Sequence, residues 1–193
     1  MAAELFEKLV KIFPSIDSYE DINFNPVNIA PTQQIQTIIK EGDKLKLVGT
    51  NWGIKFSDKS PLIFNSRIET IKEKPNWRDL FDINRSLVVM TAFYEWMTLP
   101  MSKKKQPNRI SIPGRNLFFV PAISIKMKDS DIYCTSLITT TPNRFIEQIH
   151  HRMPVIITEY NTHNYFNYTV DELIEKCRPL QDSIPMKAEE INL

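Results

Sequence analysis

Most of the chain alternates short apolar runs with polar, proline-containing stretches, a pattern typical of strands joined by turns. The apolar runs are rich in β-branched and aromatic residues, which favour extended backbone. They predict strands at residues 35–39, 44–48, 54–56, 86–90, 109–112, 117–125, 133–139 and 153–157. The sequence Glu41-Gly42-Asp43-Lys44 between the first two runs predicts a hairpin turn.

Three other segments have the spacing or the boundary signals of helices. Apolar residues recur at helical spacing over 3–13, and Pro14 is expected to end that helix. Further helices are predicted over 77–83 and over 171–177, the last with Thr169 as its N-cap. Because the helices interrupt the strands without a regular β-α-β alternation, the sequence predicts an α+β fold. We expect one domain spanning residues 1–193.

Composition narrows the classes of function. Lysine and arginine number 24 against 23 acidic residues, so any nucleic-acid role must rest on a local patch of charge. The 4 glycines form neither of the motifs that cradle nucleotide phosphates, and 2 cysteines are too few for a disulfide framework or a four-cysteine zinc site. We therefore expect no nucleotide cofactor and no metal. No apolar run approaches the roughly 20 residues of a membrane span, and the N-terminus lacks signal-peptide features, which predicts a cytoplasmic protein without a membrane partner.

Polar residues interrupt the strand pattern at residues 64–70. On a strand, alternation places Asn65, Arg67 and Glu69 on one face. This face could be the solvent-exposed side of an edge strand. It could instead line a polar cleft, in which arginine would contact a phosphate and asparagine a sugar or aldehyde oxygen.

Two further segments offer groups for proton transfer. Glu95 has aromatic neighbours in the sequence 92–96, which would raise its pKa and suit it to acid–base catalysis, although it could also be a surface glutamate. His150 and His151 are adjacent, and neighbours on a strand point opposite ways, so they are poor partners for one metal ion. One of them could carry protons in a cleft, and a structural role is the alternative.

A cysteine or serine hydrolase finds no support in the sequence. Cys134 lies within the predicted strand 133–139 and is expected to be buried and unreactive. Cys177 lies in the late helix without a catalytic signature, and no G-x-S-x-G motif occurs.

Taken in order, these segments resemble the SRAP family, the SOS-response-associated peptidase domain that crosslinks to abasic sites in single-stranded DNA. The resemblance covers about residues 28–158. It rests on N-I-A-P-T-Q at 28–33, W-G-I at 52–54, N-S-R-I-E-T at 65–70, E-K-P-N-W-R at 73–78, A-F-Y-E-W at 92–96, Q-P at 106–107 and I-H-H-R-M-P at 149–154. Ala92 stands where the family has glycine.

The resemblance implies a fold with a barrel-like core of mostly antiparallel strands and flanking helices. It also implies a reaction in which the α-amine of an N-terminal cysteine forms a Schiff base with the ring-opened abasic sugar, and the thiol closes a thiazolidine. The residues implied as catalytic are Asn65, Glu95 and His150. The residues implied as DNA-binding are Arg67, Asn28, Trp52, Phe56, Thr140 and Arg152, with Phe56 replacing the tryptophan of a family P-S-W motif.

The chain departs from the family pattern near its start. Ala2 stands where the family has cysteine, no cysteine precedes Cys134, and the short strand carrying M-C-G-R is missing. We therefore expect no thiazolidine from the chain as given, although the α-amine of Ala2, if Met1 is removed, could still form a Schiff base. Abasic-site crosslinking or lyase chemistry, a noncatalytic lesion-binding module and a self-processing peptidase stay open as functions. The expected partner is abasic single-stranded or junction DNA, bound by a monomer associated with the nucleoid.

Overall fold

The computed structural model describes residues 2–19, 28–99, 101, 104–127, 130–159, 162 and 164–192. It contains both strands and helices, which confirms the α+β class. The strands are β1 (Ile16–Tyr19), β2 (Gln34–Glu41), β3 (Lys44–Trp52), β4 (Asn65–Arg67), β5 (Arg85–Met90), β6 (Phe93–Thr98), β7 (Lys105–Ser111), β8 (Phe118–Lys126), β9 (Tyr133–Thr140), β10 (Met153–Pro154) and β11 (Lys187–Glu190). The helices are α1 (Ala2–Ile12), α2 (Ile68–Glu73), α3 (Pro75–Ile83), α4 (Arg144–Glu147) and α5 (Val170–Lys176). Among the described residues, no helix has the length and apolar character needed to span a membrane.

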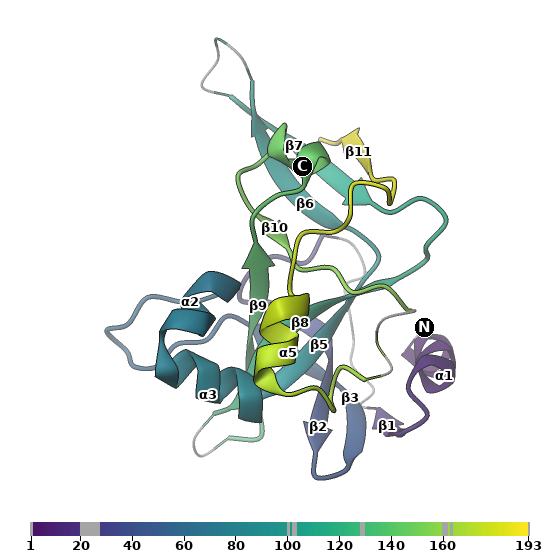
Figure 1. Ribbon diagram of the computed structural model, residues 1–193, viewed down its shortest axis with the longest axis vertical. Helices are drawn as coiled ribbons and strands as arrows, with labels where there is room; N and C mark the ends of the chain where they lie inside the picture. The colour runs from purple at the N-terminus through teal and green to yellow at the C-terminus, as the bar shows by residue number, and fades with distance from the viewer. Residues whose placement is uncertain are drawn as a thin grey trace.

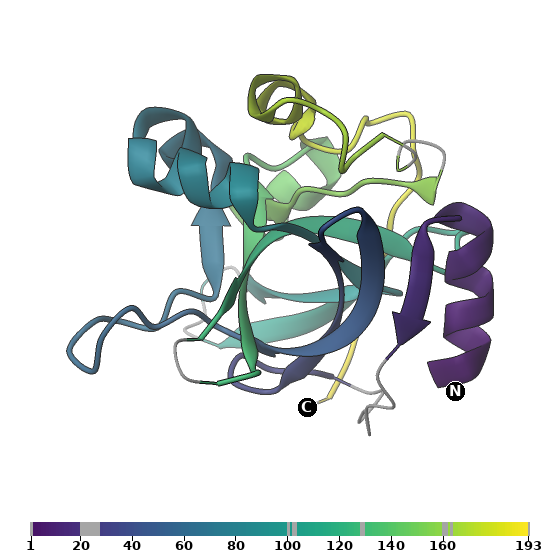
Figure 2. The same ribbon diagram turned by 90° about the horizontal axis from the view of Figure 1, so that it is seen from below.

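The large sheet curls into a barrel-like core. Its strand order is β1-β3-β2-β5-β8-β9-β10, and β3 also pairs with β9, so that the strands bend round toward one another (Figure 2). The predicted hairpin is confirmed between β2 and β3, where Glu41 pairs with Lys44 across a two-residue turn. Gly42 in that turn has a φ of 61°, a conformation that residues with a Cβ adopt only at a cost.

A smaller sheet of three strands, β11-β7-β6, lies at one end of the molecule (Figure 1). Glu95 on β6 pairs with the buried Asn108 on β7, and Glu189 on β11 pairs with Arg109 on β7. The central strand β7 therefore holds β6 in place and fixes which side of β6 the Glu95 side chain occupies.

Two apolar clusters occupy the two faces of the large sheet. The first joins the sheet to the helices and includes Leu9 of α1, Phe81 of α3 and Leu173 of α5. The second lies on the opposite strand face. Along β2, for example, Ile38 belongs to the first cluster and Ile35 to the second, as alternation requires.

A chain of five buried hydroxyl groups crosses the second face of the sheet. We call Thr37, Thr50, Thr135, Ser124 and Ser86 the hydroxyl belt. They come from β2, β3, β9, β8 and β5 in that order, and successive oxygens lie 2.7–2.8 Å apart. Thr135 donates to Thr50, and Thr37 donates to the carbonyl of Ile35. Each hydroxyl can therefore donate its one proton to the next oxygen in the same direction, from Ser86 at one end to Ile35 at the other.

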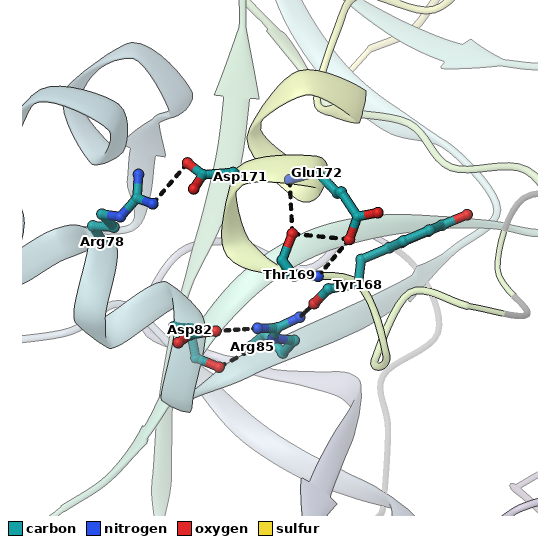
Figure 3. A network of polar contacts seen from close by, with 7 residues as sticks. All are labelled: Arg78, Asp82, Arg85, Tyr168, Thr169, Asp171 and Glu172. Carbon is teal, nitrogen blue, oxygen red and sulfur yellow. Dashed lines mark hydrogen bonds and ion pairs between the residues drawn. The ribbon is translucent and has the colours of Figure 1, made fainter.

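Arginine side chains join helix α3 and the start of β5 to α5 and to the segment that leads into it (Figure 3). Arg78 forms an ion pair of 2.7 Å with Asp171. Arg85 donates to the side chain and the carbonyl of Asp82, and it also donates to the carbonyl of Tyr168. The late helix is thereby held against α3 and the barrel.

The predicted N-cap of the late helix is confirmed. The Thr169 hydroxyl accepts from the backbone N–H of Glu172, and the Glu172 carboxylate accepts from the backbone N–H of Thr169, which makes a capping box (Figure 3). The helix itself begins at Val170, one residue earlier than the predicted range.

Several predictions of local structure were wrong in extent or type. Residues 64–70 do not form one strand, because β4 ends at Arg67 and helix α2 begins at Ile68. Ile54 makes only an isolated bridge to Ile63, and the strand predicted over 153–157 is reduced to the two residues of β10. The elements β1, β4, α2, α4 and β11 are each too short for their periodicity to identify them.

Candidate functional site

Glu95 is a partly buried carboxyl group on the small sheet. On β6 it shares a face with the buried Phe93, so alternation directs it toward the protein, and its side chain is 20% exposed. Burial raises the pKa of Glu95 to about 7, although the nearby His150 partly opposes this. A carboxyl group with this pKa can hold or release a proton near neutral pH, as acid–base catalysis requires.

His150 faces Glu95 from the end of a short helix. Its Nδ1 lies 3.4 Å from Oε2 of Glu95. Asn143 caps α4 by accepting from the N–H of Ile146, and the N–H of His150 donates to the carbonyl of Ile146 at 2.8 Å. Residues 149–152 therefore form a turn after a helix and before β10, so the two histidines do not lie on a strand. The ring of His151 lies 4.3 Å from that of His150, and no His, Cys, Asp and Glu cluster suited to a metal occurs in the described parts of the chain.

Arg152 makes four hydrogen bonds inside the protein. Its guanidinium donates to both carboxylate oxygens of Glu69 at 3.0 and 2.9 Å, and to the carbonyl and hydroxyl oxygens of Thr139 at 2.9 and 3.2 Å. Burial opposes ionisation of Glu69, but hydrogen bonds from Arg152 and the charges of Arg152 and Arg67 outweigh it and lower the pKa of Glu69. Glu69 reaches Arg152 from the first turn of α2, which corrects its predicted place on a strand.

Asn65 and Arg67 occupy alternate positions on β4, and both are exposed. Ser66 between them points inward and hydrogen-bonds to Ser136 at 2.8 Å. The predicted alternation is thus confirmed for these three residues. Because β4 pairs in parallel with β9, Arg67 lies beside Thr139, the residue that also holds Arg152.

Three of the other implied DNA-binding residues lie on neighbouring surface segments. Trp52 at the end of β3 donates its indole N–H to the carbonyl of Phe64 at 2.9 Å, and the two rings pack edge to face. Phe56 is 54% exposed and packs against Trp77 of α3. Asn28 is exposed and has a positive φ of 55°. The aromatic residues of these segments place rings on the surface that leads to β4.

Thr140 differs from the other implied residues because its side chain is only 3% exposed. It pairs with Met153 on β10, directly after the loop that carries His150. Because Thr140 lies beneath the surface, it is placed to support that loop from below and not to contact DNA directly. Its neighbour Thr139 makes the contacts to Arg152 and was missed by the sequence analysis, because three consecutive threonines offer no pattern that separates one from the next.

The contacts thus bring part of the predicted set together. Glu95 meets His150, the backbone continues to Arg152, and Arg152 meets Glu69 and Thr139 beside Arg67. Asn65 lies at the start of the strand that Arg67 ends. Asn28, Trp52 and Phe56 belong to the neighbouring surface segments and not to this chain of contacts.

Neither cysteine has the environment of a reactive thiol. Cys177 is buried at the end of α5, and burial raises its pKa to about 12. Cys134 is partly buried on β9, and burial raises its pKa as well. A thiolate is the nucleophilic form of cysteine, so both groups are poorly suited to nucleophilic attack at neutral pH.

Comparisons with known proteins identify the family of the chain. A family model described as SOS response associated peptidase (SRAP) matches residues 3–192. The chain is 34% identical over 172 residues to the abasic site processing protein YoqW of Bacillus subtilis, covering 84% of this chain and 76% of that protein. It is 29% identical over 127 residues to the abasic site processing protein YMR114C of Saccharomyces cerevisiae, covering 62% of this chain and 34% of that protein.

Solved structures share the fold. A crystal structure of a protein from Bacteroides thetaiotaomicron superposes with a TM-score of 0.80 at 22% identity, covering 99% of this chain and 88% of that one. A phage-related protein from Bordetella bronchiseptica gives a TM-score of 0.71 at 20% identity, covering 86% of this chain and 81% of that one. With the match of the family model over residues 3–192 and the similarity to YoqW, the chain belongs to the SRAP family.

Proposed function

We propose that this protein recognises abasic sites in single-stranded or junction DNA, and that Glu95 and His150 transfer protons at the ring-opened sugar. The observation that carries the proposal is the contact of 3.4 Å between the His150 ring and Glu95, a carboxyl group whose pKa is raised to about 7. The names of the relatives, abasic site processing proteins, support the choice of substrate.

The chemistry of an abasic sugar explains why such a pair is useful. When an amine adds to the aldehyde, as the α-amine of Ala2 could after removal of Met1, the amine nitrogen must lose a proton and the carbonyl oxygen must gain protons before it leaves as water. Protonated Glu95 can supply a proton to that oxygen near neutral pH, and His150 can accept or return one. The exposed amide of Asn65 is suited to a hydrogen bond with the sugar or aldehyde oxygen.

The DNA backbone and bases would be bound by the surface around β4. Arg67 is exposed, and its guanidinium is suited to contact a phosphate beside the lesion. Trp52 and Phe56 present rings on which unpaired bases can stack. Because Arg152 is already bonded to Glu69 and Thr139, we assign phosphate contact to Arg67 and a supporting role to Arg152. We propose that the protein acts as a monomer and without a cofactor.

A noncatalytic lesion-binding module is the second candidate. It is favoured by the raised pKa values of both thiols, which leave this sequence without a good thiol nucleophile. In that case Glu95 and His150 would hydrogen-bond the aldehyde or its hydrate without completing a reaction. The family description as a peptidase gains no support from these thiols.

The two candidates can be separated with one fluorescent oligonucleotide prepared with and without an abasic site. Both candidates predict tighter binding of the abasic strand, measured by fluorescence anisotropy. Only the catalytic candidate predicts an adduct trapped by borohydride, which Glu95→Gln and His150→Ala should each diminish by about 10²-fold or more. Equal affinity for the abasic and intact strands would refute both.

A further inference from the structure

The ring of His150 is contacted by the main chain of its own loop. Nδ1 lies 3.0 Å from the carbonyl oxygen of Arg152 and 3.3 Å from the backbone nitrogen of Arg152. An unprotonated Nδ1 can accept from this N–H, and a protonated Nδ1 can donate to the carbonyl or to Glu95. The ring can therefore gain or lose a proton at Nδ1 without turning, provided that the Arg152 backbone stays where it is.

The Arg152 backbone is held through its side chain. The side chain is 16% exposed, and its four hydrogen bonds go to Glu69 on α2 and Thr139 on β9. Its Nε is buried without a hydrogen-bond partner among the described residues, and such a group is costly to leave unpaired. The bidentate contact with Glu69 is charge-assisted, and such contacts are among the stronger ones that arginine makes.

We propose that Glu69 is a positioning residue. Through its bidentate contact with Arg152, it keeps the Arg152 N–H and carbonyl at Nδ1 of His150 and so keeps the His150 ring against Glu95. The inference rests on the proposed function for the use of the His150–Glu95 pair, but the geometry can be tested without DNA. Glu69 need not contact the substrate to have this effect.

The competing explanation is that the Glu69–Arg152 contact only fastens α2 to β9. Both explanations predict that Glu69→Gln lowers the melting temperature. They differ in the electrostatic coupling between His150 and Glu95, which a purely structural fastener would leave unchanged. Glu73 on the same helix is exposed and supplies a matched control, Glu73→Gln.

The test is a mutant cycle read by NMR in the DNA-free protein. Glutamate side-chain ¹³C signals report carboxyl titration, and the midpoint of Glu95 near pH 7 separates it from ordinary glutamates. Since His150 lowers the pKa of Glu95, His150→Gln should raise the Glu95 midpoint. We expect this rise to shrink by about half or more in the Glu69→Gln background, and to keep its full size in the Glu73→Gln background.

The outcomes separate this inference from the proposed function. An unchanged rise in the Glu69→Gln background would overturn the positioning role, even if abasic DNA is bound as proposed. A reduced rise supports it, even if the protein shows no preference for abasic DNA. Equal reductions in the Glu69→Gln and Glu73→Gln backgrounds would also overturn it, because the effect would then reflect general loosening of α2.

Discussion

Arg85 and Arg152 are both nearly buried, with side chains 9% and 16% exposed, but they are used differently. Arg85 engages all three guanidinium nitrogens: Nε and Nη2 donate to Asp82 and Nη1 donates to the carbonyl of Tyr168 (Figure 3). Arg152 engages only its two terminal nitrogens, with Glu69 and Thr139, and leaves Nε without a partner among the described residues.

The difference lies in what each arginine supports. Arg85 joins the end of α3 to the segment before α5, where a fully bonded side chain gives stability and no group needs to change its protonation state. Arg152 lies in the loop of His150, where its backbone N–H and carbonyl both contact Nδ1 of the His150 ring. The Nε of Arg152 is thus an incompletely satisfied polar group two residues from His150, which contacts the carboxyl group with the raised pKa, and such groups are more common at functional sites than elsewhere.

The largest expected effect concerns Arg85. Arg85→Met should lower the free energy of unfolding by about 2–4 kcal/mol, because it removes a nearly buried charge and leaves the carbonyl of Tyr168 without its donor. Arg78→Met on the neighbouring helix α3 is the matched control. Its ion pair with Asp171 is more exposed, so we expect about 1 kcal/mol or less. Urea denaturation measures the free energy of unfolding of both variants. Equal losses for Arg85→Met and Arg78→Met would show that the more buried arginine contributes no more stability than the exposed one.

The second prediction concerns pH. Burial favours the protonated form of Glu95 and raises its folded-state pKa from 4.5 to about 7, so its protonated form is the one that the fold stabilises. This contribution is fully present below pH 4.5 and is lost as pH rises through 7. Relative to Glu95→Gln, the parent should lose about 2 kcal/mol of unfolding free energy between about pH 5 and pH 8. Parallel stability curves for the two proteins would show that Glu95 titrates normally.

The third prediction compares the exposed and the bonded arginines in DNA binding. Arg67→Ala should weaken binding of abasic single-stranded DNA by about 1–3 kcal/mol and reduce the salt slope by about 1. Arg152→Met should leave the salt slope nearly unchanged, because this guanidinium is engaged within the protein. Lys40→Ala, at an exposed position on β2, controls for loss of one positive charge. A salt slope that falls only in Arg152→Met would reverse the assignment.

The smallest expected effect lies beside Arg85. Thr169→Ala removes the hydroxyl that accepts from the N–H of Glu172 at the start of α5 (Figure 3), and should cost about 1 kcal/mol of unfolding free energy. Thr169→Ser should restore most of this loss because it keeps the hydroxyl. If serine and alanine destabilise equally, the cap contributes through its methyl group instead.

Local chemistry explains which parts of the fold could be predicted from the sequence. The Gly42 turn and the Thr169 cap depend on near neighbours in the chain, and both were predicted correctly. Helix α2 was missed because Ile68–Glu73 is too short to show a period, and Ile68 and Ile71 gain their stability by burial against the rest of the protein. Strand β11 was missed for a similar reason, since it depends on β7, a strand from much earlier in the chain.

Individual residues of the candidate site could be predicted from the sequence where the residue type itself indicates a chemical role. Glu95 and His150 were selected singly from the sequence, and their contact emerges only when the small sheet meets the loop after α4. The roles of Glu69 and Thr139 could not be predicted, because a contact across 83 residues of chain leaves no local pattern. Their assignment requires the three-dimensional arrangement.

The hydroxyl belt has a consequence for how the barrel assembles. Each of its five members comes from a different strand, so a strand that joined one residue out of register would turn its hydroxyl to the opposite face. The neighbouring hydroxyls would then lose a donor or an acceptor in a dry interior, at a cost of about 1–3 kcal/mol for each unsatisfied group. Apolar side chains can pack in several strand registers, whereas the hydrogen bonds of the hydroxyl belt form in only one register. Misassembled barrels are therefore penalised at every strand that contributes a hydroxyl, including β9, whose far end holds Arg152.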